Sequence, residues 1–170
     1  GGLTIGPNFS SINGLEVGSM TIGGSGITAF VGYGDFDFGT PLANQDVFGF
    51  KLEGLDFGLG VFKPTLPIQN LPKFTAIKAQ ADSFQFRGGS ADIISIDGSN
   101  ITLNVNTGTA WPGGIGTPVI NFQSSFAANG GRLKVGTSGD PMYLDFDGNQ
   151  RIGVEVGDAR VSLFSFIHAR

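Results

Sequence analysis

Two pairs of aspartates have the residue type and spacing that best fit a chemical role in this chain. Asp35 and Asp37 flank a phenylalanine, and so do Asp145 and Asp147. In an extended strand, residues i and i+2 point to the same side, so each pair presents two carboxylates together. Carboxylate oxygens are ligands that calcium prefers. We therefore take Asp145 and Asp147 as a candidate calcium site, the alternative being that both pairs only make strand edges and turns polar.

The segment from Asp145 to Asn149 resembles the start of an EF-hand loop. It lacks the glutamate that closes such a loop, and no helical pattern flanks it. The expected site is therefore a loop site of the kind found in extracellular β-domains.

Other groups suited to catalysis are few. The only histidine is His168, and there is no cysteine. No Gly-x-Ser-x-Gly turn is available to a serine nucleophile, and the glycine-rich residues 23–26 lack the lysine and helix of a phosphate-binding loop. One tryptophan and two tyrosines are too few aromatic platforms for a two-carboxylate glycosidase. We expect no enzyme activity and no catalytic residue.

A row of polar side chains suggests a different role, which is binding to a surface. Thr102, Asn104, Asn106 and Thr107 are expected on the face opposite the apolar residues of the same strand. An exposed Thr/Asn ladder would suit binding to glycan or ice. The alternative interpretation is that these residues form a polar sheet face that contacts only water.

The elements that position these residues are strands. Apolar residues alternate with a period of two, and no segment of a dozen residues keeps helical spacing without a glycine or proline. The expected strand segments are residues 15–22, 27–31, 48–52, 57–61, 74–86 (as one strand or two), 93–96, 101–105, 119–122, 133–135, 142–146, 152–156 and 161–166.

A short motif recurs along the chain, at residues 12–17, 52–57, 96–101 and 146–152. Its first residues are 40, 44 and 50 positions apart. Three copies contain Asn-Gly or Asp-Gly, the dipeptides of type I′ turns, at Gly14, Gly98 and Gly148. We read the motif as an uneven repeat of a β-hairpin. A Gly-rich turn is also expected at residues 23–26.

Two stretches interrupt the strands, namely the proline-rich residues 63–73 and the loop 107–118. Composition does not shift across either, so residues 1–170 are predicted to be a single β domain. The predicted fold is all-β, an elongated antiparallel β-sandwich or folded sheet built from hairpin repeats. A β-helix or solenoid is the alternative, disfavoured because its coils need a nearly constant period.

Composition and charge exclude several classes of partner. The net charge of −4 and pI near 4.7 disfavour nucleic acid and an anionic membrane surface. No run of apolar residues is long enough for a transmembrane helix. With no cysteine, the chain has neither disulfides nor thiolate metal sites, which is compatible with an exported bacterial protein.

Three segments resemble a unit repeated many times in giant bacterial surface or secreted proteins. Residues 48–62 are similar to its "G-[LV]-D-F-A-L-A-L-M", residues 74–84 to its "W-T-A-L-K-A-T-A-D-S-A-S-F", and residues 96–105 to its "I-D-G-L-T-L-S-A-T-N-L-S-V". Residues 142–168 resemble its closing strands. Phe74 departs from the family's tryptophan, and both interrupting stretches are particular to this chain.

The resemblance implies a structural unit of an adhesin-like protein, outside the cell or on its surface, and a chain cut from a longer polypeptide. We expect a module that acts by stacking and self-association. Its partners would be neighbouring copies or repeats of itself, with no nucleic acid and no membrane insertion. The alternatives are a surface-binding module for glycan or ice, with or without calcium, and a filament or capsid subunit. The predicted core is Phe57, Leu59, Val61, Phe84, Phe86, Ile94, Ile96, Leu103, Val105, Phe122, Leu144, Phe146, Val154, Val156, Leu163 and Phe166.

Overall fold

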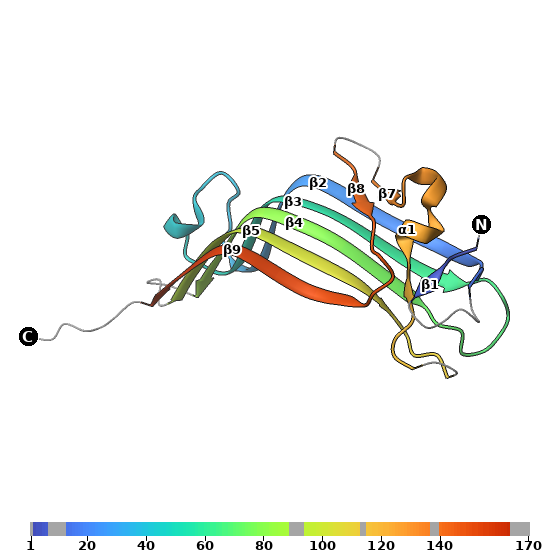
Figure 1. Ribbon diagram of the computed structural model, residues 1–170. Helices are drawn as coiled ribbons and strands as arrows, with labels where there is room; N and C mark the ends of the chain where they lie inside the picture. Colours follow the sequence, from blue (N-terminus) through green and yellow to red (C-terminus); the bar gives the residue numbers. More distant parts are fainter. Residues whose placement is uncertain (1, 7–12, 89–93, 113–114, 137–139, 164–170) are drawn as a thin grey trace, which may run out of the picture. The chain divides into compact units, whose positions relative to one another are not determined.

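The fold is all-β. The computed structural model describes residues 2–6, 13–88, 94–112, 115–136 and 140–163 (Figure 1). In chain order the elements are β1 (Ile5–Gly6), β2 (Val17–Gly34), η2 (Leu42–Asn44), β3 (Val47–Pro64), β4 (Phe74–Gly88), β5 (Ile94–Gly108), β6 (Val119–Ile120), α1 (Phe122–Ser125), η3 (Ala127–Asn129), β7 (Leu133–Val135), β8 (Met142–Leu144) and β9 (Arg151–Leu163). None of the described helices is long and apolar enough to cross a membrane.

Five long strands form the main sheet, in the order β2-β3-β4-β5-β9. Two small antiparallel sheets accompany it, β1-β6 and β7-β8. The sheets are antiparallel and not closed, so the predicted fold class is confirmed. The described strands do not form the parallel coils of the alternative β-helix.

The predicted hairpin repeat is wrong, because two of its copies lie inside single strands. Asp97 and Gly98 belong to β5, and neither adopts the positive φ that a type I′ turn requires. Within these two copies, the residues with positive φ are Gly54 in β3 and Asn100 in β5, at 61° and 53°. One left-handed residue within a paired strand is typical of a β-bulge, which twists a strand without reversing it.

The glycine-rich turn predicted at residues 23–26 is also absent, since these residues lie within β2. At the first and fourth copies of the motif the chain does turn, with Gly14 and Gly148 at φ values of 81° and 87°. Neither turn is a hairpin between successive long strands, because Leu15 bridges to Leu3 beside the first turn, and after the second turn β9 pairs with β5 while Asp147 bridges to Asn121.

The two irregular stretches are confirmed as connections. Residues 65–73 join β3 to β4, and residues 65–70 are exposed. The described part of the second stretch lies between the end of β5 at Gly108 and the start of β6 at Val119.

The chain divides into two compact units. The first unit comprises Gly1–Ser25, Asp56–Ala79 and Leu103–Val154, and the second comprises Gly26–Leu55, Gln80–Thr102 and Glu155–Arg170. Every strand of the main sheet contributes residues to both units.

The first unit has a hydrophobic core on one side of the sheet. Figure 1 shows β1, α1, β7 and β8 lying on this side. Packed together are buried residues from the sheet strands and from these smaller elements: Leu3, Ile5, Leu15, Phe62, Phe74, Ala76, Ile120, Phe122, Val135, Leu144 and Phe146. The pattern of apolar residues in the sequence therefore identifies only part of this core, namely Phe122, Leu144 and Phe146.

Two glycines of β3 allow the β7-β8 sheet to approach closely. A Cβ at Gly58 would lie 3.1 Å from Met142 Cβ and 3.3 Å from Val135 Cβ, and one at Gly60 would lie 3.1 Å from Leu144 Cδ1. Phe62 continues this face of the strand into the core. The core side of β3 is therefore marked by small residues, which sequence alternation alone reads as the outer side.

The opposite side of the sheet in the first unit carries the apolar residues that the sequence predicts as core. Phe57, Leu59 and Val61 alternate with the core-facing residues of β3 and are only partly buried. Val154 is 65% exposed. In Figure 1 no described helix or strand of the first unit lies on this side of the sheet. We call it the open face, and by strand alternation its apolar residues are Met20, Ile22, Phe57, Leu59, Val61, Ile77, Ala79, Leu103, Val105, Ile152 and Val154.

The second unit is held together by aromatic pairs and ion pairs. Phe50 stacks on Phe84 with ring centroids 5.4 Å apart, and Phe48 meets Phe86 edge to face at 5.5 Å. Arg87, only 6% exposed, lies 2.9 Å from Asp97, in a geometry that leaves this carboxylate oxygen without a hydrogen bond.

The core predicted in the second unit is wrong at its exposed positions. Ile94 and Val156 are exposed, while Phe84, Phe86 and Ile96 are partly buried. The buried apolar residues here are Leu42, Val47 and Ala81. The predicted core residues Leu163, for its side chain, and Phe166 lie outside the described part of the chain.

Candidate functional site

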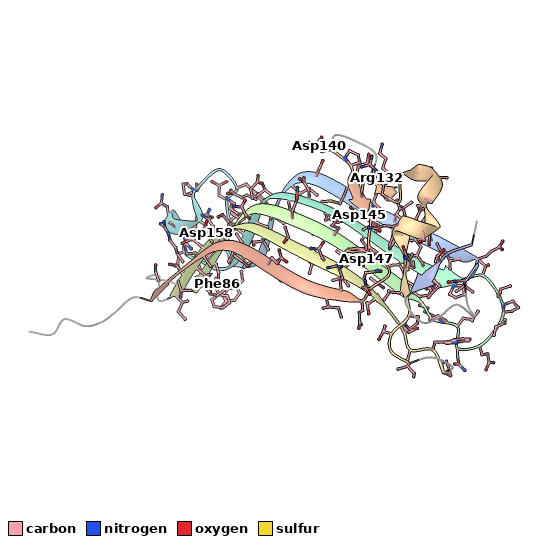
Figure 2. The ribbon with its side chains drawn as sticks, in the orientation of Figure 1. Phe86, Arg132, Asp140, Asp145, Asp147 and Asp158 are labelled. Atoms are coloured by element: carbon pink, nitrogen blue, oxygen red, sulfur yellow. The ribbon has the colours of Figure 1, made fainter. Side chains whose placement is uncertain are left out.

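Asp145 and Asp147 lie at a polar pocket of the first unit. The pocket has a volume of about 240 Å³ and is lined by Lys78, Asn104, Gln123, Asp145, Phe146, Asp147 and Arg151. Figure 2 shows the two labelled aspartates near each other on the segment that follows β8. The two candidate residues therefore lie together at one pocket.

Several backbone contacts fix this segment. Asn121 forms a β-bridge with Asp147, and the Phe122 amide donates to the Phe146 carbonyl at 2.9 Å. Phe146 is buried in the core between the two aspartates. Because neighbouring residues of an extended chain point to opposite sides, anchoring Phe146 turns both carboxylates toward the pocket.

Each carboxylate in the pocket is paired with a cation. Lys78 Nζ lies 2.8 Å from Asp145 Oδ1, and Arg151 Nη2 lies 3.1 Å from Asp147 Oδ2. The amide of Gln123 also donates to the Asp145 carbonyl at 3.3 Å. Two positive and two negative side chains leave the pocket close to neutral.

The pKa of Asp147 lies below its ordinary value. The main cause is the hydrogen bond from the Asn149 amide to Asp147 Oδ1, 3.2 Å long, and the Asn149 side chain and Arg151 lower the pKa further. Hydrogen bonds and a cation both favour the charged carboxylate. Asp147 is thus held as an anion, which suits a binding or structural role and not that of a proton donor.

A calcium ion at Asp145 and Asp147 would compete with Lys78 and Arg151 for the same oxygens. Within the described ranges, no group of three or more His, Cys, Asp or Glu side chains comes together. Calcium at this pocket stays a prediction.

Of the other residues singled out in the sequence for a binding or catalytic role, only Asn104 lies at this pocket among the described residues. Asp37 accepts hydrogen bonds from the Gly39 amide, at 3.0 Å, and from the Thr40 hydroxyl, at 2.7 Å, in the loop between β2 and β3. These bonds lower its pKa and make it a turn residue. His168 lies outside the described part of the chain.

The predicted exposed Thr/Asn ladder is wrong. Asn104 lines the pocket, and Asn106 is completely buried, with its amide donating to the Ile120 carbonyl at 2.9 Å. Asn104 and Asn106 lie on the core side of β5 and do not form a flat exposed surface, so the support for ice binding is lost.

Sequence reasoning missed the two cations and Gln123 of the pocket, and it singled out Asn104 only as part of an exposed ladder. One signal was present, because Lys78 follows Phe74 and Ala76 at every second position of β4, which places a charge in line with core residues. Arg151 had no such signal, since its place depends on the turn that brings β9 next to β5.

No known protein family, curated protein or solved structure matches this chain.

Proposed function

We propose that this chain is a structural module, without enzyme activity, that associates with copies of itself through the edges of its five-stranded sheet. The observation that carries the proposal is β2, an edge strand of 18 residues that contains no charged residue and no proline. Edge strands normally carry charges, prolines or a cover that prevents pairing with other chains. β2 has neither a charged residue nor a proline along its whole length.

The opposite edge of the sheet is also long. β9 spans 13 residues, pairs with β5 among the described strands, and is exposed at residues 151–162. Its charged side chains include Arg151, Glu155 and Asp158, so β9 is the better protected edge. Pairing of β2 with the β9 of another copy would extend the sheet from chain to chain, as a stacked or tandem assembly requires.

An extracellular or cell-surface setting is part of the proposal. It is supported by the absence of cysteine and by the resemblance to repeats of giant bacterial surface proteins. The polar pocket supports the non-enzymatic role, because its two carboxylates are both paired with cations.

The test is the oligomeric state of edge variants, measured by sedimentation velocity over a range of protein concentrations. Thr21 and Thr28 are exposed residues of β2. The variant Thr21→Lys/Thr28→Lys adds charges that disfavour strand pairing. We expect the wild type to associate as concentration rises and this variant to stay monomeric.

A matched control adds the same charge away from the edge, through Ser124→Lys/Ala128→Lys at exposed positions of α1 and η3. The control should associate like the wild type. A wild-type chain that is monomeric throughout, or an edge variant that associates equally well, would refute the proposal.

A second candidate function is glycan binding at the pocket. Its amide side chains, Asn104 and Gln123, together with balanced ion pairs suit hydrogen bonding to sugar hydroxyls. Titration with oligosaccharides in a calorimeter tests this role, and Gln123→Ala should remove any heat of binding that the wild type shows.

A further inference from the structure

The open face of the first unit has a strongly one-sided composition. From β2 across to β9 its side chains are aliphatic or aromatic, interrupted by glycine and threonine. Met20 and Ile22 at one edge are 57% and 48% exposed, and Ile152 and Val154 at the other are 71% and 65% exposed. Exposed apolar patches of several hundred Å² usually mark a binding surface.

Two lysines lie at one end of this face. Lys63 follows Val61 on β3, and Lys73 comes directly before β4, in the same alternation as Ile77. β3 and β4 are antiparallel neighbours, so the end of one lies beside the start of the other. The backbone of Lys73 is fixed by Thr109, whose amide donates to its carbonyl at 2.9 Å.

Neither lysine has an anionic partner within the described residues. The ion pairs of the structure involve Lys51, Lys78, Arg87 and Arg151. Residues 57–81 contain three lysines and no acidic residue, and residues 98–139 contain no acidic residue either. Glu16 lies close to this end of β3, since its backbone carbonyl accepts from the Thr65 amide at 3.1 Å.

We infer that the open face of the first unit binds an anionic lipid, with its acyl chain along the apolar rows of β3 and β4 and its anionic headgroup at Lys63 and Lys73. Charge complementarity selects this occupant over a second copy of the chain, because packing a like face here would bring two unpaired lysines into the interface. From Phe57 to Lys63 the strand rises about 20 Å, close to the length of an extended chain of about sixteen carbons.

The inference does not rest on self-association, since it uses a face of the sheet and not its edges. The test uses the full chain carrying Thr21→Lys/Thr28→Lys, so that edge pairing does not interfere. The probes are palmitate, hexadecanol with the same chain length and no charge, and acetate with the charge and no chain. Binding is measured by calorimetry below the micelle concentration, and circular dichroism checks the fold of every variant.

We expect palmitate to bind more tightly than hexadecanol and acetate not to bind. Lys63→Gln and Lys73→Gln should each weaken palmitate binding about threefold to fivefold, as for exposed charge pairs, and leave hexadecanol unchanged. Glu16→Gln should strengthen palmitate binding, because it removes a negative charge from a residue close to the end of β3. Ile152→Ser should weaken palmitate and hexadecanol alike, since it reduces the apolar surface.

The charge-matched control is Lys134→Gln, an exposed residue of β7 on the core side of the sheet, which should leave palmitate binding unchanged. Three results would overturn the inference: no palmitate binding, equal binding of palmitate and hexadecanol, or equal loss in Lys134→Gln and the two open-face lysine variants. Palmitate binding that declines as protein concentration rises would instead show that a second copy covers the face.

Discussion

At the scale of single residues, the pocket is organised by the pairing of opposite charges. Asp145 and Asp147 are brought together by the buried Phe146 between them, and each faces a cation from a different strand, Lys78 on β4 and Arg151 on β9. The pocket therefore joins strands that are far apart in sequence. Its polar groups hold the segment after β8 against the sheet.

The lowered pKa of Asp147 predicts how this residue affects stability at different pH. A carboxyl whose pKa is depressed by folding stabilises the folded state above its ordinary pKa, near 3.8, and loses that effect as the pH falls through the lowered value. Compared with Asp147→Asn, the wild type should be more stable near neutral pH, and this advantage should disappear in strong acid. Urea unfolding across pH measures the difference.

The control for this prediction is Asp140→Asn, at an exposed residue with no ion pair among the described residues. A wild-type advantage over Asp147→Asn that grows as the pH falls would contradict the assigned role of Asp147.

At the scale of elements, β3 shows how glycines shape the strands of the sheet. Gly54 adopts a φ of 61° within the strand, and a Cβ there would collide with the Asp82 carboxylate on β4. Gly54→Ala should therefore cost about 1–3 kcal/mol in the free energy of unfolding, as for other strained backbone positions. Chemical denaturation measures this cost.

The matched control is Gly153→Ala on β9, where a new Cβ would meet nothing within 4 Å. Glycine loses more conformational freedom than alanine when a strand forms, so this change should stabilise the folded protein by about 0.5 kcal/mol. Equal effects of the two substitutions would show that Gly54 is not held in a left-handed conformation.

The two faces of β3 also differ in how much they contribute to stability. Phe122 of α1 is fully buried on the core side and lies 5.8 Å from Phe62 between ring centroids. Phe122→Ala should cost about 3–5 kcal/mol. Phe57→Ala, on the open face, should cost about 1–2 kcal/mol, because its ring is only partly removed from water.

Thermal and chemical unfolding of the two phenylalanine variants provide the comparison. Should Phe57→Ala destabilise the isolated chain as much as Phe122→Ala, the open face would have to be covered within the chain itself.

At the scale of the whole molecule, the sequence predicts the fold class and most strand locations, since period-2 alternation reports extended structure directly. It does not predict which side of a strand is covered. In β3 the bulky alternation of Phe57, Leu59 and Val61 suggests a core, whereas the covered side carries Gly58 and Gly60. Close approach of the β7-β8 sheet favours small residues, and no local pattern reveals which later segment makes that approach.

Contacts between segments far apart in the sequence also explain why the turn predicted at residues 97–98 does not form and why the cations of the pocket were not predicted. The Asp-Gly dipeptide at residues 97–98 favours a turn locally, but pairing of β5 with strands on both sides keeps it extended. The pocket could be predicted in part, because the spacing of Asp145 and Asp147 is local. Its cations could not, because their positions depend on strand order.

The most direct test of the central claim, pairing at the sheet edge, is hydrogen–deuterium exchange of the β2 amides at increasing protein concentration. Amides of β4, which has a partner on each side, provide the internal reference. If copies of the chain pair through this edge, protection of β2 should rise with concentration toward that of β4. If β2 exchanges at the same rate at every concentration while β4 stays protected, the account of self-association is wrong.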